Sequence, residues 1–468
     1  MLGFSMKRFY IFISFVSFIL LPGSNISAGQ KGQSTDQALQ SAQKPSGQVL
    51  LSQADSVLKE MSRITGLPIK SPLKKRVVDR SEIRQIVTAK LHADYTPEEL
   101  REQEATLKAF GLVPADFDLA KFLTDFYTEQ AAGFYDPRTK TMYIASWVAS
   151  SQQNMVLAHE LTHALQDQNY NLQKYIQAVK DDDDASAARL AVVEGYATAA
   201  MIQELMGSIP LAQMPSMQPF MAMAIHQDAA EFPVFAKAPF FFRFQSLFPY
   251  SQGLDFIQKD LARSDWKGLT RLFTEPPQTS QQIFDPALYF AHTPVAHLDL
   301  PHPPVPARQP EFRKVNENAF GELGYYCLLG QFISEDEAKS LAPAWAADRY
   351  AVYEAPKNHQ LALIARAIWT SQKKAEQFFK DYQTILRKKY GAGLTVESSG
   401  AETFVASIPK GEAVIILKGR QCVFGEEISS RQESKFKKWA ASLPDTVISP
   451  GNQIALEGMG KMEPARSN

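Results

Sequence analysis

The sequence His159-Glu160-Leu161-Thr162-His163, within the mostly apolar stretch 154–166, decides how the rest of the chain is interpreted. In an α-helix, side chains four residues apart project from the same face, so His159 and His163 lie one above the other with Glu160 at their flank. Two imidazoles and a carboxylate in this arrangement can hold zinc and take a proton from a water molecule bound to it. The stretch therefore predicts a metal-binding helix; the alternative is a helix that buries two histidines without a metal.

Asn154 can cap the helix that carries this motif, and neither Gly nor Pro interrupts that helix. A second helix offers the missing ligand. Zinc held by two histidines requires a third protein ligand and keeps a fourth position for water. Glu194, on a helix expected from about residue 185 to 205, stands among apolar residues, where a carboxylate must be paired or metal-bound. The alternatives for Glu194 are a surface position or a buried ion pair with Arg189.

These residue types indicate a hydrolytic reaction. Zinc lowers the pKa of a bound water to about 7, and Glu160 can accept its proton as attack on a carbonyl begins. Glu160 can then pass the proton to the leaving amine, so that a peptide bond is cleaved. The oxyanion needs a further donor. Tyr196 and Tyr250 are both candidates, and the sequence does not choose between them.

The composition is that of a globular protein without charge bias. The chain has 468 residues, 45% hydrophobic and 21% charged, which is enough for two or three domains with a large core. Because the 49 basic residues are balanced in number by 50 acidic ones, nothing in the composition favours nucleic-acid binding. The two cysteines, Cys327 and Cys422, can form one disulfide in an exported protein or remain separate buried thiols.

The N-terminus predicts export. Two basic residues precede an apolar segment, Phe9–Leu21, and small residues up to Ala28 follow it. This is the pattern of a signal peptide over residues 1–28; the segment is short for a membrane span, and an uncleaved anchor is the alternative. We expect a secreted or periplasmic protein with no stable membrane span once the signal is removed. Residues 29–53 are polar and predict a flexible linker.

Upstream of the metal motif, the sequence predicts helices and one hairpin. Apolar residues at helical spacing mark Asp79–Lys90, Thr96–Phe110 and Leu119–Glu129. Two short β-prone pieces around an Asp-Pro-Arg-Thr turn predict a hairpin over Gly133–Ala145. A strand at this place can bind an extended peptide along its edge, or it can simply support the metal helix.

Downstream of the motif, an acidic run and a Pro-rich run divide the chain. Lys180–Asp184 is expected to be a solvated loop whose last residue, Asp184, caps the next helix. A Pro-rich linker over 301–311 separates a metal-binding domain (54–300) from a smaller α+β domain (312–448), and a disordered tail covers 449–468. The smaller domain is expected to contain helices at Gly321–Ile333, Ser371–Tyr390 and Arg431–Ser442 and strands at Arg349–Glu354, Leu361–Trp369, Thr403–Ser407 and Ala413–Leu417.

The metal motif, with Glu194 on a following helix, resembles the gluzincin branch of zinc metallopeptidases. A wider pattern over about residues 79–355 is similar to a group of secreted, mostly uncharacterised bacterial proteins that are treated as metalloproteases. That pattern comprises Gly133-Phe134-Tyr135-Asp136-Pro137, the metal motif, Val193-Glu194-Gly195, Phe248-Pro249-Tyr250 with Gly253, and Trp345 with Asp348-Arg349. The resemblance implies a zincin fold, with a mixed sheet above the metal helix.

The sequence departs from the gluzincin pattern at one place. Many gluzincins carry an aspartate four residues after the liganding glutamate, where it orients a histidine ligand. Here that position is Thr198. Either another carboxylate orients the histidine, or the site is tuned differently.

The predicted fold is α+β and mostly helical, with a zincin-like metallopeptidase domain followed by a smaller C-terminal α+β domain. We expect an exported zinc-dependent peptidase that acts on peptides or proteins, with His159, His163 and Glu194 as metal ligands and Glu160 as general base. The alternative is a non-catalytic binding or scaffold protein on a zincin fold, with a structural or vestigial metal. Glu160 favours the enzyme, because a purely structural zinc site needs no general base.

Overall fold

The structure is a computed structural model of the chain, and it describes residues 47–148, 150–220, 232–303, 312–355, 357–444, 447–449 and 452–454. The predicted signal peptide (1–28) lies outside the described residues, as do most of the Pro-rich linker (301–311) and most of the predicted tail (449–468). The predicted flexible linker (29–53) overlaps the structure only at its end, where a helix begins at Gly47. The domain boundaries drawn from these segments stay predictions.

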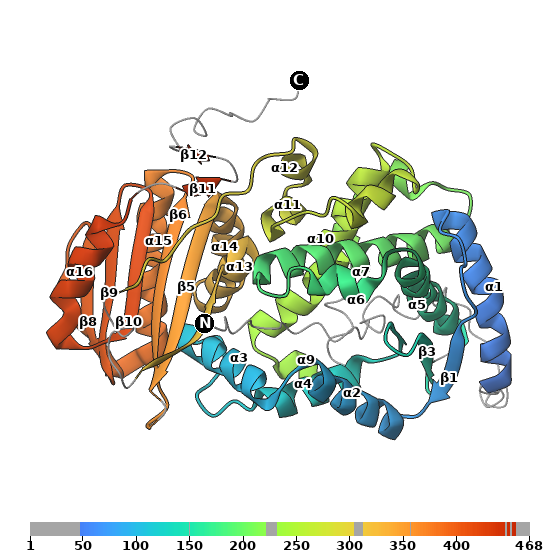
Figure 1. Ribbon diagram of the computed structural model, residues 1–468, viewed down its shortest axis with the longest axis horizontal. Coiled ribbons are helices and arrows are strands. Elements are labelled where there is room, and N and C mark those ends of the chain that lie inside the picture. The colour runs from blue at the N-terminus through green and yellow to red at the C-terminus, as the bar shows by residue number, and fades with distance from the viewer. Residues whose placement is uncertain are drawn as a thin grey trace, which may run out of the picture.

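Helices form most of the chain before the C-terminal sheet (Figure 1). They are α1 (Gly47–Thr65), α2 (Arg80–Asp94), α3 (Pro97–Phe110), α4 (Leu119–Gln130), α5 (Ser150–Tyr170), α6 (Leu172–Gln177), α7 (Asp183–Met206), α9 (Pro233–Lys237), α10 (Phe240–Leu261), α11 (Ser280–Phe284) and α12 (Pro286–Phe290). Asp79 caps α2 and Thr96 caps α3, each in a capping box with the glutamate three residues on. The three helices predicted upstream of the metal motif are confirmed as α2, α3 and α4.

A three-stranded sheet lies beside the metal helix. Its order is β1-β3-β2, with β1 at Lys74–Val78, β2 at Gly133–Asp136 and β3 at Thr141–Ala145. Strands β2 and β3 pair antiparallel, which confirms the predicted hairpin, while β1 runs parallel to β3. The sequence analysis missed β1, because its residues Lys-Lys-Arg-Val-Val show no apolar alternation. Strand β2 is an edge strand, and α5 packs against it.

The C-terminal part is a seven-stranded sheet of order β4-β5-β6-β10-β9-β8-β7, in which every neighbouring pair is antiparallel. The strands are β4 (Arg313–Asn318), β5 (Trp345–Ala355), β6 (Gln360–Trp369), β7 (Thr395–Ser399), β8 (Thr403–Ile408), β9 (Gly411–Lys418) and β10 (Gln421–Ile428). The helices are α13 (Gly321–Phe332), α14 (Glu335–Leu341), α15 (Gln372–Tyr390) and α16 (Glu433–Ser442). The predicted helices and strands of this part are confirmed, and β4, β7, β10 and α14 are elements that were not predicted. Strands β11 (Val447–Ser449) and β12 (Asn452–Ile454) pair with each other and overlap the start of the predicted tail.

Both faces of this sheet are covered. Successive residues of a strand face opposite sides. In β9, Val414 and Ile416 belong to the cluster that includes Phe436 of α16, whereas Ile415 belongs to the cluster that includes Phe378 of α15. Helices α15 and α16 therefore cover opposite faces, as Figure 1 also shows.

Apolar packing joins the C-terminal sheet to the helical part. The largest hydrophobic cluster runs from Ala54 in α1 to Phe424 in β10. Helix α3 packs against β4, β5 and β6, and its Phe110 stacks on Phe320 with ring centroids 4.4 Å apart. The metal helix α5 lies at the other end of the molecule from the outer strands of the sheet (Figure 1).

The acidic run differs from its prediction. Helix α7 begins inside it at Asp183, and Asp182, not Asp184, is the N-cap residue, accepting the backbone N–H of Ala185. Lys180 and Asp181 are exposed in a turn, as predicted, but Asp183 and Asp184 are 2% and 3% exposed, so the end of the run is buried helix and not a solvated loop. Carboxylates are favourable in the first turn of a helix, and Asp184 accepts the backbone N–H of Ser280 at 3.1 Å and its hydroxyl.

Two further sequence questions are answered by the described residues. Cys327 and Cys422 are both buried and free, so they form no disulfide with each other. None of the helices in the described ranges combines the length and apolarity that crossing a membrane demands.

Candidate metal centre

Helix α5 carries the metal motif and is longer than predicted. It starts at Ser150, so Asn154 lies inside the helix, where its Nδ2 donates to Oε1 of Glu204 on α7 at 2.8 Å. The helix is surrounded by α1, α7 and β2, which explains why it is apolar on most sides. His159 and His163 project from one face, with ring centroids 4.7 Å apart and ring planes at 82°.

Helix α7 brings Glu194 to these histidines because α7 packs between α5 and α10. It packs on α5, and its contact with α10 is the most extensive between any two described helices. A Cβ atom at Gly195 would meet the carbonyl of Gly253 in α10 at 2.4 Å, so only glycine fits at this crossing. Close backbone contact therefore fixes α7, and with it Glu194, against the rest of the site.

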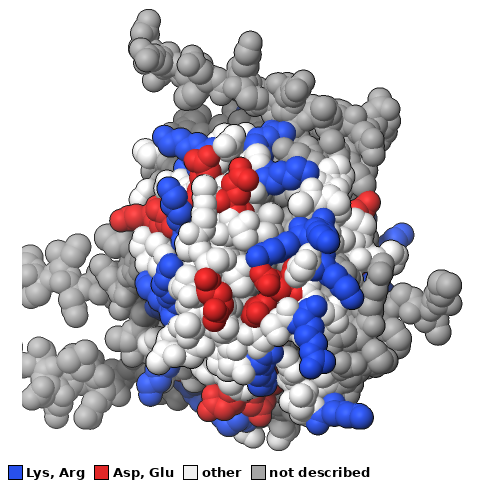
Figure 2. All heavy atoms as spheres, turned by 90° about the vertical axis from the view of Figure 1, so that its left-hand side faces the viewer, with Lys and Arg blue, Asp and Glu red and all other residues white. Residues whose placement is uncertain are grey.

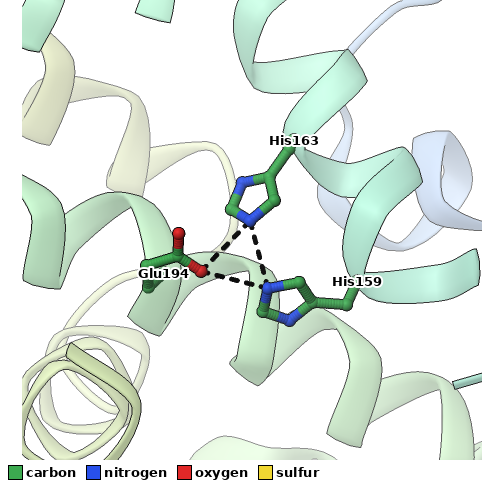
Figure 3. Close-up of side chains that lie close together, drawn as sticks. All are labelled: His159, His163 and Glu194. Carbon is green, nitrogen blue, oxygen red and sulfur yellow. Dashed lines mark hydrogen bonds and ion pairs between the residues drawn. The ribbon is translucent and has the colours of Figure 1, made fainter. Parts of the chain in front are cut away.

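Three potential ligand atoms meet at one point (Figure 3). Nε2 of His159 lies 3.0 Å from Nε2 of His163, and Oε2 of Glu194 lies 3.1 and 3.2 Å from these two nitrogens. In tetrahedral coordination with bonds of about 2.1 Å, neighbouring ligand atoms stand about 3.4 Å apart. Among the residues that the structure describes, this is the one group of three or more His, Cys, Asp or Glu placed to hold a metal ion.

Gln166 fixes which nitrogen of His163 faces this point. Its Nε2 donates to the backbone carbonyl of Val193 at 3.0 Å, so its Oε1 is the atom that faces Nδ1 of His163 at 2.8 Å. That Nδ1 must carry the proton, which leaves Nε2 of a neutral His163 with a lone pair. The lone pair is directed at an oxygen of Glu194 that is itself an acceptor. A metal ion between them would satisfy both acceptors, so the residues fit a metal ion.

The pKa values of two of the three candidate ligands, Glu194 and His159, agree with this assignment. Burial disfavours charge on Glu194, but the two imidazoles outweigh burial and hold the pKa of this carboxyl far below its usual range. Burial lowers the pKa of His159 to about 4, so its imidazole is neutral, as metal binding demands. Burial also opposes a charge on His163, but Glu194 raises the pKa of this imidazole to about 9. A metal ion bound here would therefore have to displace a proton from Nε2 of His163.

Glu160 is held by the edge strand of the small sheet. Its Oε2 accepts the backbone N–H of Tyr135 in β2 at 2.8 Å. The Tyr135 hydroxyl donates to Oδ2 of Asp167 at 2.7 Å, one turn of α5 beyond His163, and Lys140 donates to the same oxygen at 2.6 Å. Strand β2 is thus attached to α5 at two points, and the orientation of the Glu160 carboxylate is set by backbone.

The structure distinguishes between the two tyrosines considered for the oxyanion. The Tyr250 ring lies 5.9 Å from the ring of His159, at 29° to it. Tyr196 contacts Trp266 and Phe273 instead, in edge-to-face geometry. Since Tyr196 is two positions after Glu194 in the helix, these side chains point to opposite sides of α7.

Other residues singled out in the sequence lie away from the metal ligands. Arg189 donates to the backbone carbonyl of Tyr175 at 2.6 Å, so it forms no described ion pair with Glu194. Trp345 donates to Asp348, which also accepts the backbone N–H groups of Phe320 and Gly321. These residues attach β5 to α13, and their role is in the fold.

Two buried polar atoms lack a hydrogen-bond partner in the described part of the chain, one at the position that departs from the gluzincin pattern and one on a candidate ligand. Oγ1 of Thr198 and Nδ1 of His159 are buried without a hydrogen-bond partner among the described residues. The residue that supports a histidine ligand is the amide Gln166, not the carboxylate expected as one possibility. The sequence analysis missed Gln166 and Tyr135 as supporting residues; the spacing of Gln166, three residues after His163 on the same helix, was the available signal.

Two family models match parts of the chain. Residues 116–199 match a Peptidase_M78 model, described as an IrrE N-terminal-like domain, and residues 308–428 match a domain of unknown function (DUF8575). No curated protein and no solved structure matches the chain. The first match contains the three candidate ligands and Glu160, and it supports a domain related to zincin-like metallopeptidases.

Proposed function

We propose that this protein is an exported, zinc-dependent peptidase of the gluzincin type. The observation that carries the proposal is the convergence of two imidazole nitrogens and one carboxylate oxygen within 3.2 Å of one another, beside Glu160. The match of residues 116–199 to a peptidase family model supports the same conclusion. Export rests on the N-terminal sequence pattern over residues 1–28.

His159, His163 and Glu194 would hold the zinc ion. Zinc bound there supplies a Lewis acid that makes water a nucleophile at neutral pH. Glu160 would accept the proton of the attacking water on its carboxylate and return it to the nitrogen of the leaving amine. The Tyr135 N–H orients that carboxylate, and Tyr250, whose ring lies beside that of His159, would donate to the developing oxyanion.

The edge strand favours a peptide as the substrate. Strand β2 pairs with β3 on one side only, and Tyr135 gives its N–H to Glu160 on the other side. All four residues of β2 are buried, so an extended peptide would reach this outer edge, beside the general base, only after a covering segment moves. Sequence specificity would then come from side chains that line the same edge.

A non-catalytic metal-binding protein is the second candidate, and burial is the observation that favours it. The side chains of His159, Glu160 and His163 are at most 1% exposed, and that of Glu194 is 4% exposed. A substrate can reach such a site only when a covering segment moves. A structural metal has no such requirement.

One experiment separates the two candidates. Hydrolysis of a broad mixture of internally quenched peptides is measured with the zinc-loaded chain beside Glu160→Gln. The peptidase predicts cleavage by the wild type and a loss of about 10²–10⁴-fold in the variant, with equal zinc content. Equal rates in both proteins, or no cleavage by the zinc-loaded wild type, would leave the non-catalytic protein. Export is tested separately: the protein recovered outside a bacterial cytoplasm should begin after Ala28.

A further inference from the structure

A second potential site lies at the junction of α3 with the C-terminal sheet. A cavity of about 970 Å³ opens there, bordered by the C-terminal ends of α3, α13 and α15 and by one end of β5, β6 and β10. Its volume is at the upper end of the range of about 300–1,000 Å³ in which proteins bind small molecules. None of the candidate metal ligands lines it, and its share of the sheet falls within the match to the domain of unknown function.

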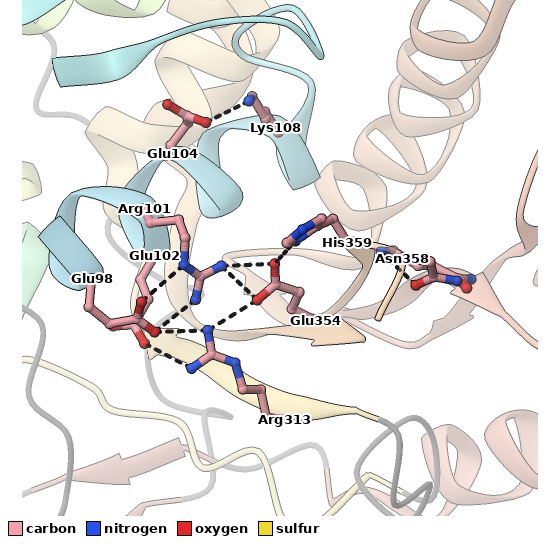
Figure 4. A network of polar contacts seen from close by, with 10 residues as sticks. Glu98, Arg101, Glu102, Glu104, Lys108, Arg313, Glu354, Asn358 and His359 are labelled. Carbon is pink, nitrogen blue, oxygen red and sulfur yellow. Dashed lines mark hydrogen bonds and ion pairs between the residues drawn. The ribbon is translucent and has the colours of Figure 1, made fainter. Parts of the chain in front are cut away.

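Most of the acidic groups of the cavity are already neutralised. The pairs are Glu104 with Lys108 at 2.6 Å, Glu354 with Arg101 at 2.7 Å, and Glu426 with Lys389 at 2.6 Å. Figure 4 shows the first two, with Arg313 and His359 also directed at Glu354. The pairs of Glu354 and Glu426 attach α3 and α15 to the sheet, and the pair of Glu104 lies within α3. All three are part of the wall and are not available to a ligand.

Three charged side chains of the lining remain. Lys388 and Lys410 have no acidic partner within 4 Å among the described residues, and Glu427 keeps one buried oxygen, Oε2, without a hydrogen-bond partner there. Lys410 is close enough to Glu427 to influence its ionisation. Figure 2 looks onto the end of the molecule formed by the sheet, where cationic and anionic side chains are interspersed. Because neither sign of charge dominates this end of the molecule, selectivity for a charged ligand must come from Lys388, Lys410 and Glu427 in the cavity itself.

Glu427 is held in an unusual backbone conformation. Its φ is +60°, a left-handed value that costs free energy for any residue with a side chain. It lies where the register between β10 and β9 shifts, between Gly425 and Ile428. Such bulges redirect side chains and occur often beside functional sites. Here the bulge adds Glu427 to the lining of the cavity instead of continuing the ladder.

We propose that this cavity binds a short peptide with both termini free. The peptide's ammonium group would pair with Glu427, its carboxylate with Lys410 and Lys388, and an apolar side chain would lie against Phe240 and Phe332. An anion alone would leave the buried oxygen of Glu427 unsatisfied, and a cation alone would face two lysines. A zwitterion satisfies all three groups. A peptidase releases such peptides, so the role of the cavity as a product-binding site rests on the proposed function. The binding of a short peptide does not depend on it.

The test uses the full exported chain carrying Glu160→Gln and treated with a chelator, so that the metal site neither cleaves nor binds the probe. The probe is the tripeptide Leu-Gly-Phe, compared with its N-acetyl form and its C-terminal amide by titration calorimetry. We expect one site per chain, and at least about tenfold weaker binding for each blocked form. Glu427→Gln should weaken the free tripeptide and leave the N-acetyl form unchanged. Lys410→Gln should weaken the free tripeptide and leave the C-terminal amide unchanged.

Lys373→Gln is the matched control, because Lys373 is an exposed lysine of α15 that does not line the cavity. It should bind all three peptides like the parent protein. Equal affinity for the free and blocked peptides would overturn the proposal, as would unchanged binding in both Glu427→Gln and Lys410→Gln. Because Lys410 is exposed, its replacement leaves the fold intact even if that of Glu427 does not. Hydrolysis by the zinc-loaded wild type is measured separately, so failure of the peptidase and failure of this site are distinguishable.

Discussion

Nδ1 of His163 donates to Oε1 of Gln166 at 2.8 Å, and this contact directs Nε2 of the same ring toward Glu194. A residue that carries no charge therefore determines the tautomer of a candidate metal ligand. The same amide donates to the carbonyl of Val193 on α7, so it also links the two helices that hold the ligands. Support of this kind raises the basicity of the ligand and reduces the freedom of its ring.

Gln166→Leu should lower zinc affinity by about 10–100-fold, because the ring of His163 loses its orienting partner. Affinity is measured by competition with a chromogenic chelator. Gln153→Leu is the control, since Gln153 is another buried glutamine of α5 whose Nε2 donates only to the backbone carbonyl of Val148. If both variants lose affinity equally, the effect belongs to the stability of α5 and not to His163.

Tyr250→Phe should lower the turnover number by about 10–10³-fold with little change in zinc content, because it removes a donor to the oxyanion. Steady-state hydrolysis of a quenched peptide provides the measurement. Tyr196→Phe keeps an aromatic ring on the other side of α7 and should hydrolyse the peptide at nearly the wild-type rate. A larger loss for Tyr196→Phe than for Tyr250→Phe would reverse the assignment.

Thr198→Asp should tighten zinc binding by about tenfold or more, because a carboxylate one turn after Glu194 offers an acceptor to the buried Nδ1 of His159. The change restores the residue common among gluzincins. Thr198→Asn, of the same shape but uncharged, measures how much of the gain comes from charge. Weaker zinc binding in Thr198→Asp would show that His159 is oriented from another direction.

The stability of the protein should decrease from acidic to mildly alkaline pH, in part through Glu322 of α13. Burial, together with the nearby Asp184 carboxyl, raises the pKa of Glu322 from 4.5 to about 8. The folded state therefore keeps a proton that the unfolded state releases, and stabilisation present below pH 4.5 is lost as the pH rises to about 8.

Glu322→Gln removes this loss. At about pH 9 its free energy of unfolding should exceed that of the wild type by about 1–2 kcal/mol, and the difference should shrink toward pH 4.5. Urea unfolding at a series of pH values provides the measurement. Parallel curves for the two proteins across that range would mean that Glu322 ionises normally in the folded state.

The candidate metal centre could be predicted from the sequence because helical spacing is a local property. His159, Glu160 and His163 lie within five consecutive positions of one helix, and their relative placement follows from 3.6 residues per turn. Glu194 came from the coordination requirement of zinc, with its partners at 3.1 and 3.2 Å. Whether this group binds zinc stays a prediction that the structure supports by geometry.

Long-range contacts explain what the sequence analysis missed. Strand β1 is a strand because it pairs with β3, more than sixty residues later, and not because of its own residues. The acidic run was expected in solvent, yet Asp184 is buried because Ser280 of α11 supplies two donors. The sequence could not choose between Tyr250 and Tyr196 as the oxyanion donor, because the choice depends on how α7 and α10 cross. Such contacts depend on tertiary packing that no local pattern encodes.

The most direct test of the account is the zinc content of the purified full-length protein and of Glu194→Ala, measured by mass spectrometry after equilibration with a zinc buffer. The account predicts one zinc ion per wild-type chain, and an affinity at least about 100-fold lower in Glu194→Ala, which exceeds the usual cost of losing a supporting hydrogen bond. A wild-type chain that binds no zinc, or a Glu194→Ala variant that binds it with unchanged affinity, would contradict the metal centre formed by His159, His163 and Glu194.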